Sequence, residues 1–291
     1  MKYQSFTITK AYKTIYYFLK EEGFAENFIT NLRKVWGNLK VNNEIVNIRK
    51  SLKTGDILEI NSNPNNKTTI MHCIIPLDIV YEDKYYLLIN KPSGLSCMPS
   101  RSHYSNNLAG AICHYMKDRD DNFVLRILNR LDKDTAGIII VAKDSISANK
   151  LKNIEKTYYA ICVGKINKQT VIDKKIKTLN INGKNEHKRI ISQDGQDAIT
   201  RISPIIYTDN HSLLSIHLEH GRTHQIRLHL SSISHALLGD ELYGQKSELI
   251  SHTALLCKQI SFYHPYLEKS LHFEVDYPED FKRALDKLNL K

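Results

Sequence analysis

The sequence has few cysteines, and their spacing gives them no evident structural or metal-binding role. The five cysteines among 291 residues include no C-x-x-C pair, and an odd number argues against a disulfide framework. The thirteen histidines do not combine with them in the pattern of a zinc finger. We therefore expect reduced thiols and no zinc site.

Long apolar runs are also missing. Residues 1–5 do not lead into an apolar segment of signal-peptide length, and no later run of about eighteen apolar residues could span a bilayer. There is neither a glycine-rich nucleotide-binding motif nor a cluster of metal ligands. The missing apolar runs predict a cytoplasmic protein with no membrane-spanning segment.

The charge of the chain is strongly positive. A net charge of +10 and a pI near 9.2 favour a polyanionic partner, because clustered cations gain affinity by neutralising phosphates and releasing counterions. Nucleic acid is the first expectation and an anionic membrane the second. A composition that is simply rich in lysine is the alternative interpretation.

Residues 1–62 have a pattern of their own. Apolar residues recur at helical spacings over 15–19 and 29–35, and residues 39–46 alternate around Asn42 and Asn43 as in a hairpin. A turn and a strand are expected over 52–60. Basic side chains, Arg33 and Lys34 among them, accompany these elements. The polar segment 63–75 is expected to link this small domain to a second one over 76–291.

Strands predominate from residue 76 onward. Residues 79–83 and 85–94 predict a hairpin that ends in a Pro-Gly turn and contains Lys91. A short helix is expected over 144–152 and a strand over 156–164. Residues 166–195, rich in Lys and Asn, predict a mobile basic loop.

The segment 125–143 reads as strand, loop and strand, and its loop contains Arg130, Asp132 and Asp134. Loops held between rigid strands often place reactive side chains. The cations at Arg130 and Lys133 would keep the Asp132 carboxylate ionised even if the loop were partly covered. On spacing alone, a solvated turn is the simpler interpretation.

These segments resemble the RluA/RluD-type RNA pseudouridine synthases. The family's catalytic motif H-R-L-D-x-x-T-S-G matches at Arg130, Leu131, Asp132, Thr135 and Gly137. Asn129 and Ala136 depart from it. The most specific match is G-R-T-H-Q-I-R-L-H-L at 221–230, which is followed by G-D-x-x-Y-G at 239–244. The resemblance covers residues 76–276 and implies an α+β fold with a mixed, largely antiparallel sheet.

The resemblance also implies roles for individual residues. Asp132 would be the catalytic aspartate, Arg227 its ion-pair partner, and Tyr158 the active-site tyrosine. Arg130 would fill the gap left by an extruded uridine, while Arg222, His224 and Gln225 would shape the pocket and contact the RNA backbone. Lys91 is a further predicted RNA contact, and a solvated turn residue is the alternative interpretation for it.

Residues 1–62 resemble the α-L RNA-binding domain of the S-four type. Its pattern V-N-G-x-x-V followed by L-x-x-G-D-x-I-x-I matches the segments 41–46 and 52–60, whereas the first half of the domain matches poorly. An accessory RNA-binding domain is therefore expected, with Arg33 and Lys34 as contacts. A small cap that packs on the second domain and touches no RNA is the alternative.

We therefore predict a monomeric isomerase that converts uridine to pseudouridine in structured RNA, with large-subunit ribosomal RNA favoured over transfer RNA and no membrane partner. The implied reaction needs no metal and no cofactor, which agrees with the missing nucleotide-binding motif and metal-ligand cluster. A non-catalytic RNA-binding or ribosome-assembly protein on the same fold is one alternative. A metal-dependent nuclease using Asp132 and Asp134 is another, although no further acidic residues cluster to complete a metal site.

Overall fold

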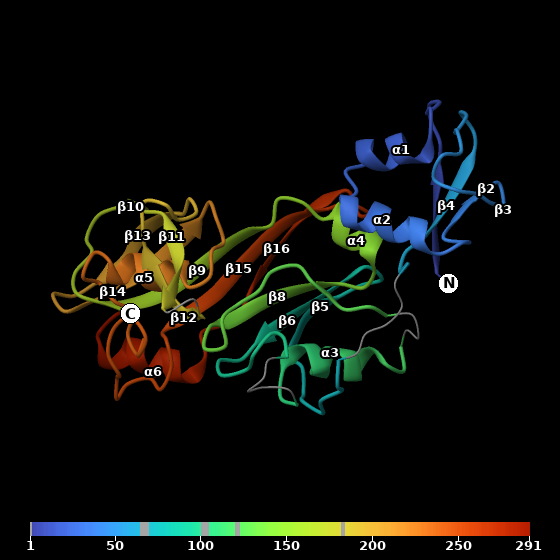
Figure 1. The fold of residues 1–291 in the computed structure, drawn as a ribbon. Helices are drawn as coiled ribbons and strands as arrows, with labels where there is room; N and C mark the ends of the chain where they lie inside the picture. Colours follow the sequence, from blue (N-terminus) through green and yellow to red (C-terminus); the bar gives the residue numbers. More distant parts are fainter. Residues whose placement is uncertain (1, 65–69, 100–104, 120–122, 182–183) are drawn as a thin grey trace.

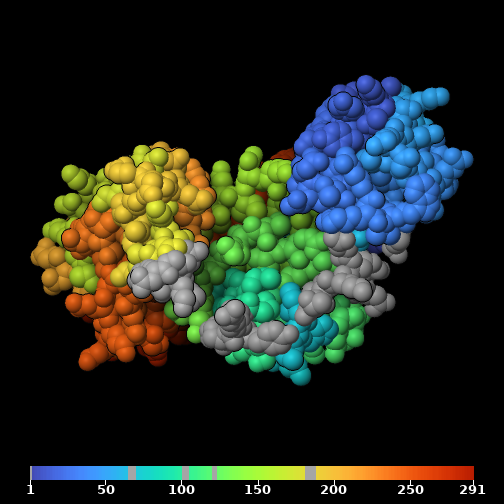
Figure 2. All heavy atoms as spheres, viewed as in Figure 1, coloured from blue at the N-terminus to red at the C-terminus, as the bar shows by residue number. Residues whose placement is uncertain are grey.

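A computed structural model describes residues 2–64, 70–99, 105–119, 123–181 and 184–291. Figure 1 shows an elongated molecule with a small N-terminal domain at one end and a long twisted sheet through the remainder. Figure 2 shows the N-terminal domain as a separate lobe.

The N-terminal domain combines two helices with a four-stranded antiparallel sheet. Its elements are β1 (Tyr3–Thr7), α1 (Ile15–Glu21), α2 (Glu26–Lys34), β2 (Leu39–Val41), β3 (Glu44–Ile45) and β4 (Ile57–Asn61), and the strand order is β1-β4-β2-β3. Asn42 and Asn43 have φ values of 50° and 71°, as a tight hairpin turn requires. The predicted helices and hairpin of this segment are present.

The second domain is built on a ten-stranded sheet. Its elements begin with β5 (Ile79–Glu82), β6 (Tyr86–Lys91), α3 (Leu108–Met116), β7 (Arg126–Ile127), β8 (Ala136–Ala142), α4 (Ser145–Lys150), β9 (Glu155–Val163) and β10 (Thr170–Asp173). They continue with β11 (Ile176–Ile181), β12 (Lys184–Ile191), β13 (Ile199–Tyr207), β14 (His211–Leu218), α5 (Gln225–Ser231), β15 (Leu255–His264), β16 (Lys269–Glu274) and α6 (Glu279–Lys287).

The strand order of this sheet is β10-β13-β14-β9-β15-β8-β6-β5, with β16 paired to β15 and β7 to β8. Only the β15–β8 pair is parallel among these strands. The fold is therefore α+β with a mixed, largely antiparallel sheet, as predicted.

The strands β8 and β15 approach each other closely at the centre of the sheet. Every residue of β8 is buried, which fits its continuous apolar sequence. Gly137 has a φ of 114°, and a Cβ at this position would lie 2.2 Å from the carbonyl oxygen of Cys257. Glycine is needed here because any side chain would push the two strands apart.

The N-terminal domain contacts the second domain through α4. Ile146 of α4 joins the apolar core of the N-terminal domain. The Ser145 amide donates to the carbonyl of Ser62 at 2.9 Å, and the Ala25 amide donates to Oδ1 of Asn149 at 2.8 Å. These contacts fix the orientation of the small domain on the sheet.

The segment 166–195 is not the loop that its composition predicted. It contains β10 at the edge of the large sheet and a separate hairpin of β11 and β12. Ile172 and Ile176 are buried, and these apolar anchors within a basic segment explain the difference.

The described residues include no helix long and apolar enough to cross a membrane.

Candidate active site

A cavity of about 520 Å³ lies where the loop between β7 and β8 faces β9 and the start of α5. Asp132, Tyr158, His224 and Arg227 all line it, although they come from three segments that are distant in sequence. The centre of the sheet sets this arrangement, because Tyr158 pairs with Cys257 on β15, and Cys257 pairs with Gly137 on β8. The aspartate loop leads directly into β8.

Side-chain donors hold the backbone carbonyls of the aspartate loop from one side. The Sγ atom of Cys97 donates to the carbonyl of Leu131 at 3.1 Å, and the Ser93 hydroxyl donates to the carbonyl of Asp134 at 2.9 Å. Lys91 reaches the carbonyl of Lys133 at 3.0 Å. Three carbonyls around Asp132 are therefore fixed by the end of β6 and the segment that follows it, so the backbone of the loop is preorganised around the carboxylate.

Lys91 was predicted to contact RNA, with a solvated turn residue as the alternative, and both interpretations are wrong. Its side chain is 0% exposed, and its ammonium donates to the carbonyls of Pro92, Leu95 and Lys133 at 2.9, 2.9 and 3.0 Å. Burial lowers the pKa of Lys91 to about 8. Lys91 thus supports the loop from within the protein.

The departures from the family motif are accommodated inside the protein. Asn129 is buried; its Nδ2 donates to the carbonyl of Ile138 at 2.9 Å, and its Oδ1 accepts from the amide of Ile140 at 2.7 Å. Ala136 is buried opposite Leu256 on β15. Asn129 therefore ties the start of the loop to β8.

The turn before α5 is organised by Gln225, which was predicted to contact RNA. This side chain is 2% exposed and uses its amide within the protein. Its Oε1 accepts from the Arg222 amide at 3.0 Å, while its Nε2 donates to the Ile199 carbonyl and the Thr200 hydroxyl at 3.0 and 3.1 Å. Gln225 therefore shapes the pocket wall, as the resemblance implied, but its side-chain amide is used within the protein and the predicted RNA contact is wrong.

Arg227 projects from the first turn of α5 toward the pocket. Its Nη1 lies 3.9 Å from Oδ2 of Asp132, but its shorter bonds go to Asp240. Nε and Nη2 donate to the two carboxylate oxygens of Asp240 at 2.8 and 2.7 Å, and this carboxylate is fully buried. Burial lowers the pKa of Arg227, but Asp240 and then Asp132 outweigh it and leave that pKa raised.

Asp240 was not assigned a role from the sequence. Besides Arg227, it accepts the backbone amides of Leu242 and Tyr243, each at 3.1 Å. The motif G-D-x-x-Y-G was the available signal, because this spacing places an acidic residue in a turn beside a tyrosine. The two fork-like bonds fix the plane of the guanidinium and leave its remaining nitrogen directed at Asp132.

His224 lies between Asp132 and Tyr243. Its Nε2 is 3.9 Å from Oδ2 of Asp132, and its Nδ1 shares a 3.0 Å hydrogen bond with the hydroxyl of Tyr243. That hydroxyl accepts the amide of Arg189 at 2.7 Å, so its proton is available to Nδ1. Burial lowers the pKa of His224. The Asp132 carboxylate acts to raise this pKa, and Arg227 lowers it further. A neutral imidazole with its proton on Nε2 fits this arrangement.

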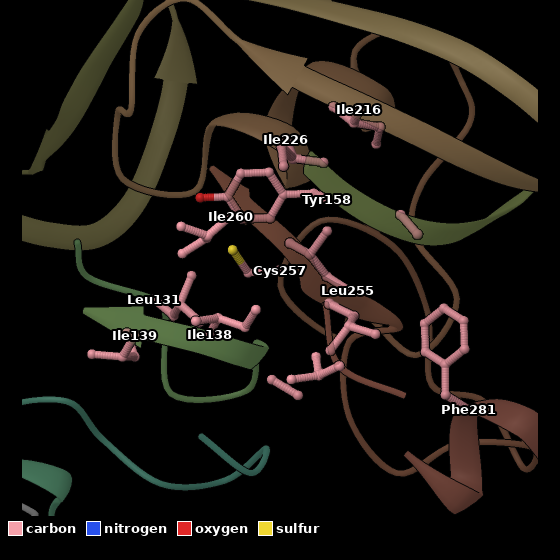
Figure 3. Close-up of a cluster of buried hydrophobic side chains, with 14 of the residues drawn as sticks. Leu131, Ile138, Ile139, Tyr158, Ile216, Ile226, Leu255, Cys257, Ile260 and Phe281 are labelled. Atoms are coloured by element: carbon pink, nitrogen blue, oxygen red, sulfur yellow. The ribbon is translucent and has the colours of Figure 1, made fainter. Parts of the chain in front are cut away.

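Tyr158 forms the apolar floor of the pocket together with residues from three other segments. Figure 3 shows its ring in a buried cluster with Leu131, Ile226, Leu255 and Cys257. Burial raises the pKa of Tyr158 well above its ordinary value, and Cys257 and Asp132 add to this rise. The hydroxyl therefore stays protonated at neutral pH and acts as a hydrogen-bond group rather than a base.

The remaining predicted contacts lie at different places. Arg130 is exposed at the mouth of the pocket, and Arg222 lies on its wall with Nε bonded to the carbonyl of Asp197 at 3.1 Å. Arg33 and Lys34 are exposed on α2 of the N-terminal domain and do not line this pocket. Arg189 of β12 does line it, which the basic composition of 166–195 had indicated.

Comparison with known proteins agrees with this geometry. Residues 85–232 match the family model described as RNA pseudouridylate synthase. The chain is 31% identical to "Uncharacterized RNA pseudouridine synthase YjbO" of Bacillus subtilis over 94% of this chain and 98% of that protein. It is 34% identical to "Ribosomal large subunit pseudouridine synthase D" of Zymomonas mobilis, over 72% and 71%.

A solved structure, "Human RNA Pseudouridylate Synthase Domain Containing 4", shares the fold. It aligns with a TM-score of 0.57 at 24% identity and covers 72% of this chain and 92% of its own. The structural alignment therefore covers most of the chain.

Proposed function

The chain belongs to the RNA pseudouridylate synthase family and is an isomerase that acts on RNA, and from this premise we propose that its substrate is structured ribosomal RNA, with Asp132 as the catalytic carboxylate. The observation that carries the assignment of Asp132 is its position. Its side chain is 27% exposed in the pocket, with Arg227 and His224 each 3.9 Å away and a loop backbone held by three hydrogen bonds.

The reaction moves one bond and one proton. The bond from C1′ of ribose to N1 of uracil breaks, the base rotates within the pocket, and C1′ bonds to C5; the C5 proton leaves and N1 gains one. We propose that Asp132 acts on the sugar side, where a carboxylate stabilises or captures the electron-poor C1′ while the base turns.

Each neighbour of Asp132 then has a limited role. Arg227, fixed by Asp240, offsets the desolvation of the carboxylate. Tyr158 supplies a flat surface and a neutral hydroxyl for the uracil and its sugar. His224 offers an N–H group beside the carboxylate. None of these groups needs to change its charge during the rotation of the base.

Arg130 is proposed to assist base extrusion. A uridine stacked in folded RNA must leave the stack before its glycosidic bond can meet a carboxylate, which costs a few kcal/mol. Arg130 is exposed on the same loop two residues before Asp132, and a planar guanidinium can stack between bases while it contacts phosphate.

The choice of ribosomal RNA rests on two supports. Several relatives, including those of Zymomonas mobilis and Vibrio parahaemolyticus, are named ribosomal large subunit pseudouridine synthase D. The N-terminal domain also presents Arg33 and Lys34 at its surface, which suits a large structured target. Transfer RNA is the second candidate.

Pseudouridine maps of ribosomal and transfer RNA from cells with and without this gene test the proposal. We expect at least one pseudouridine to be lost from large-subunit ribosomal RNA and to return with the wild-type gene but not with Asp132→Asn. Loss of a site in transfer RNA alone would overturn the substrate assignment, and return of the site with Asp132→Asn would overturn the catalytic one.

A further inference from the structure

The N-terminal domain has a second cavity, of about 390 Å³, that the active-site chemistry does not use. It lies between the end of α2 and the segment that follows β3. Its lining residues are Leu32, Arg33, Val35, Trp36, Leu39, Val46, Asn47, Ile48 and Arg49. Its volume falls within the range of about 300–1,000 Å³ that is usual for small-ligand sites.

Trp36 is the unusual feature of this cavity. It is the only tryptophan in the chain, and it is 70% exposed although it borders an apolar hollow. Exposed indole surface loses the favourable free energy of burial unless a ligand covers it. A flat ligand that packs against the ring would recover that free energy.

The charges around Trp36 indicate the kind of ligand. Arg33 of α2 and Arg49 of the segment after β3 are both exposed and line the cavity, and none of the nine lining residues is acidic. The guanidinium of Arg33 also lies 5.4 Å from the ring centre of Tyr16 on α1. An aromatic surface beside cations is the arrangement that binds single-stranded nucleic acid, through base stacking and phosphate neutralisation.

We propose that Trp36 stacks on an unpaired base of the RNA substrate, while Arg33 and Arg49 contact the phosphates on either side. The inference rests on the RNA-modifying activity, but it does not depend on whether the RNA is ribosomal. Its consequence is a second point of attachment: the small domain binds a single-stranded segment at a distance from the uridine that enters the active site.

Because Trp36 is the only tryptophan, its fluorescence reports on this cavity alone. Asp132→Asn protein, used to prevent turnover, is titrated with a short oligouridylate and with a fully paired RNA duplex of the same length, while a labelled RNA measures binding separately. We expect the oligouridylate to quench Trp36 and the duplex to leave it unchanged. Unchanged fluorescence at saturating oligouridylate would overturn the proposal.

Substitutions provide the second readout. Trp36→Ala is expected to weaken oligouridylate binding about 5-fold to about 150-fold, the range for loss of one stacked base, and Trp36→Phe to lose less. Arg49→Gln should lower the dependence of log affinity on log salt by about one unit. Tyr263→Ala, at a tyrosine of β15 that is 55% exposed, is the matched control and should change neither quantity.

The two proposals fail in distinguishable ways. If Trp36→Ala and Tyr263→Ala bind oligouridylate equally well, the stacking site is wrong whatever the RNA target. If quenching occurs but deletion of the gene removes no ribosomal pseudouridine, only the substrate assignment is wrong.

Discussion

Two sets of cations surround the active-site loop, and they differ in burial rather than in charge. Lys91 and Arg227 are buried and direct their nitrogen atoms at protein carbonyls or carboxylates. Arg130 and Lys133 are exposed on the loop itself. The first set is expected to determine stability and the position of Asp132, and the second set to determine how RNA is bound.

Replacement of Asp132, which lies between the two sets of cations, is expected to have the largest effect. Asp132→Asn should abolish pseudouridine formation and leave folding and RNA affinity near those of the wild type, because the amide keeps the shape and loses the charge. Pseudouridine in purified RNA is measured after incubation with protein in the presence of a chelator. Asp134→Asn, two residues further along the loop, is the matched control and should remain active; substantial activity in Asp132→Asn would contradict the assignment.

The buried set is tested at Arg227. Replacing it with leucine leaves Asp240 as an unpaired buried charge, so we expect the free energy of unfolding to fall by about 3–5 kcal/mol and turnover to fall as well. Chemical denaturation and steady-state kinetics measure the two effects.

A double variant separates those effects. Arg227→Leu combined with Asp240→Leu should recover much of the lost stability, because no unpaired charge remains, but it should not recover turnover. Recovery of both would show that Arg227 acts on the fold alone.

The exposed set is tested at Arg130. Arg130→Ala should reduce kcat/KM on structured RNA on the order of 10- to 100-fold, because base extrusion costs a few kcal/mol, and should have little effect on a short single-stranded substrate. Lys133→Ala is the neighbouring control and should affect the two substrates equally. Equal losses for Arg130→Ala on both substrates would place this residue in the chemistry or in loop support.

The smallest expected effect is a change of stability with pH, and it comes from Lys91 of the buried set. The pKa of Lys91 is about 8 in the folded protein, against roughly 10.4 for an unfolded lysine. At pH values between these two pKa values, the Lys91 side chain binds more protons in the unfolded state than in the folded state. Its contribution to the free energy of unfolding therefore rises with pH, by about 1–2 kcal/mol from pH 7.5 to 9.5.

Comparison with Lys91→Met isolates this contribution from other titrating groups. The difference in the free energy of unfolding between wild type and variant should grow in favour of the wild type as the pH rises through this window. Parallel profiles for the two proteins would mean that Lys91 titrates normally in the fold.

Local patterns in the sequence determined many of the elements correctly. Asn42 and Asn43 tolerate positive φ, so the hairpin of β2 and β3 follows from two residues. The apolar runs on both sides of Asp132 similarly specify a loop between β7 and β8. These predictions succeeded because the responsible interactions lie within a few residues of each other.

The sequence by itself also determined the family, through motifs whose order and spacing match at many positions. What only the tertiary structure decided is which polar side chains are buried. Lys91 and Gln225 were predicted to contact RNA and Asp240 had no assigned role, yet each is enclosed by segments that are distant in sequence. Burial of a polar group depends on the partners that satisfy it, and those partners come together only when the chain folds.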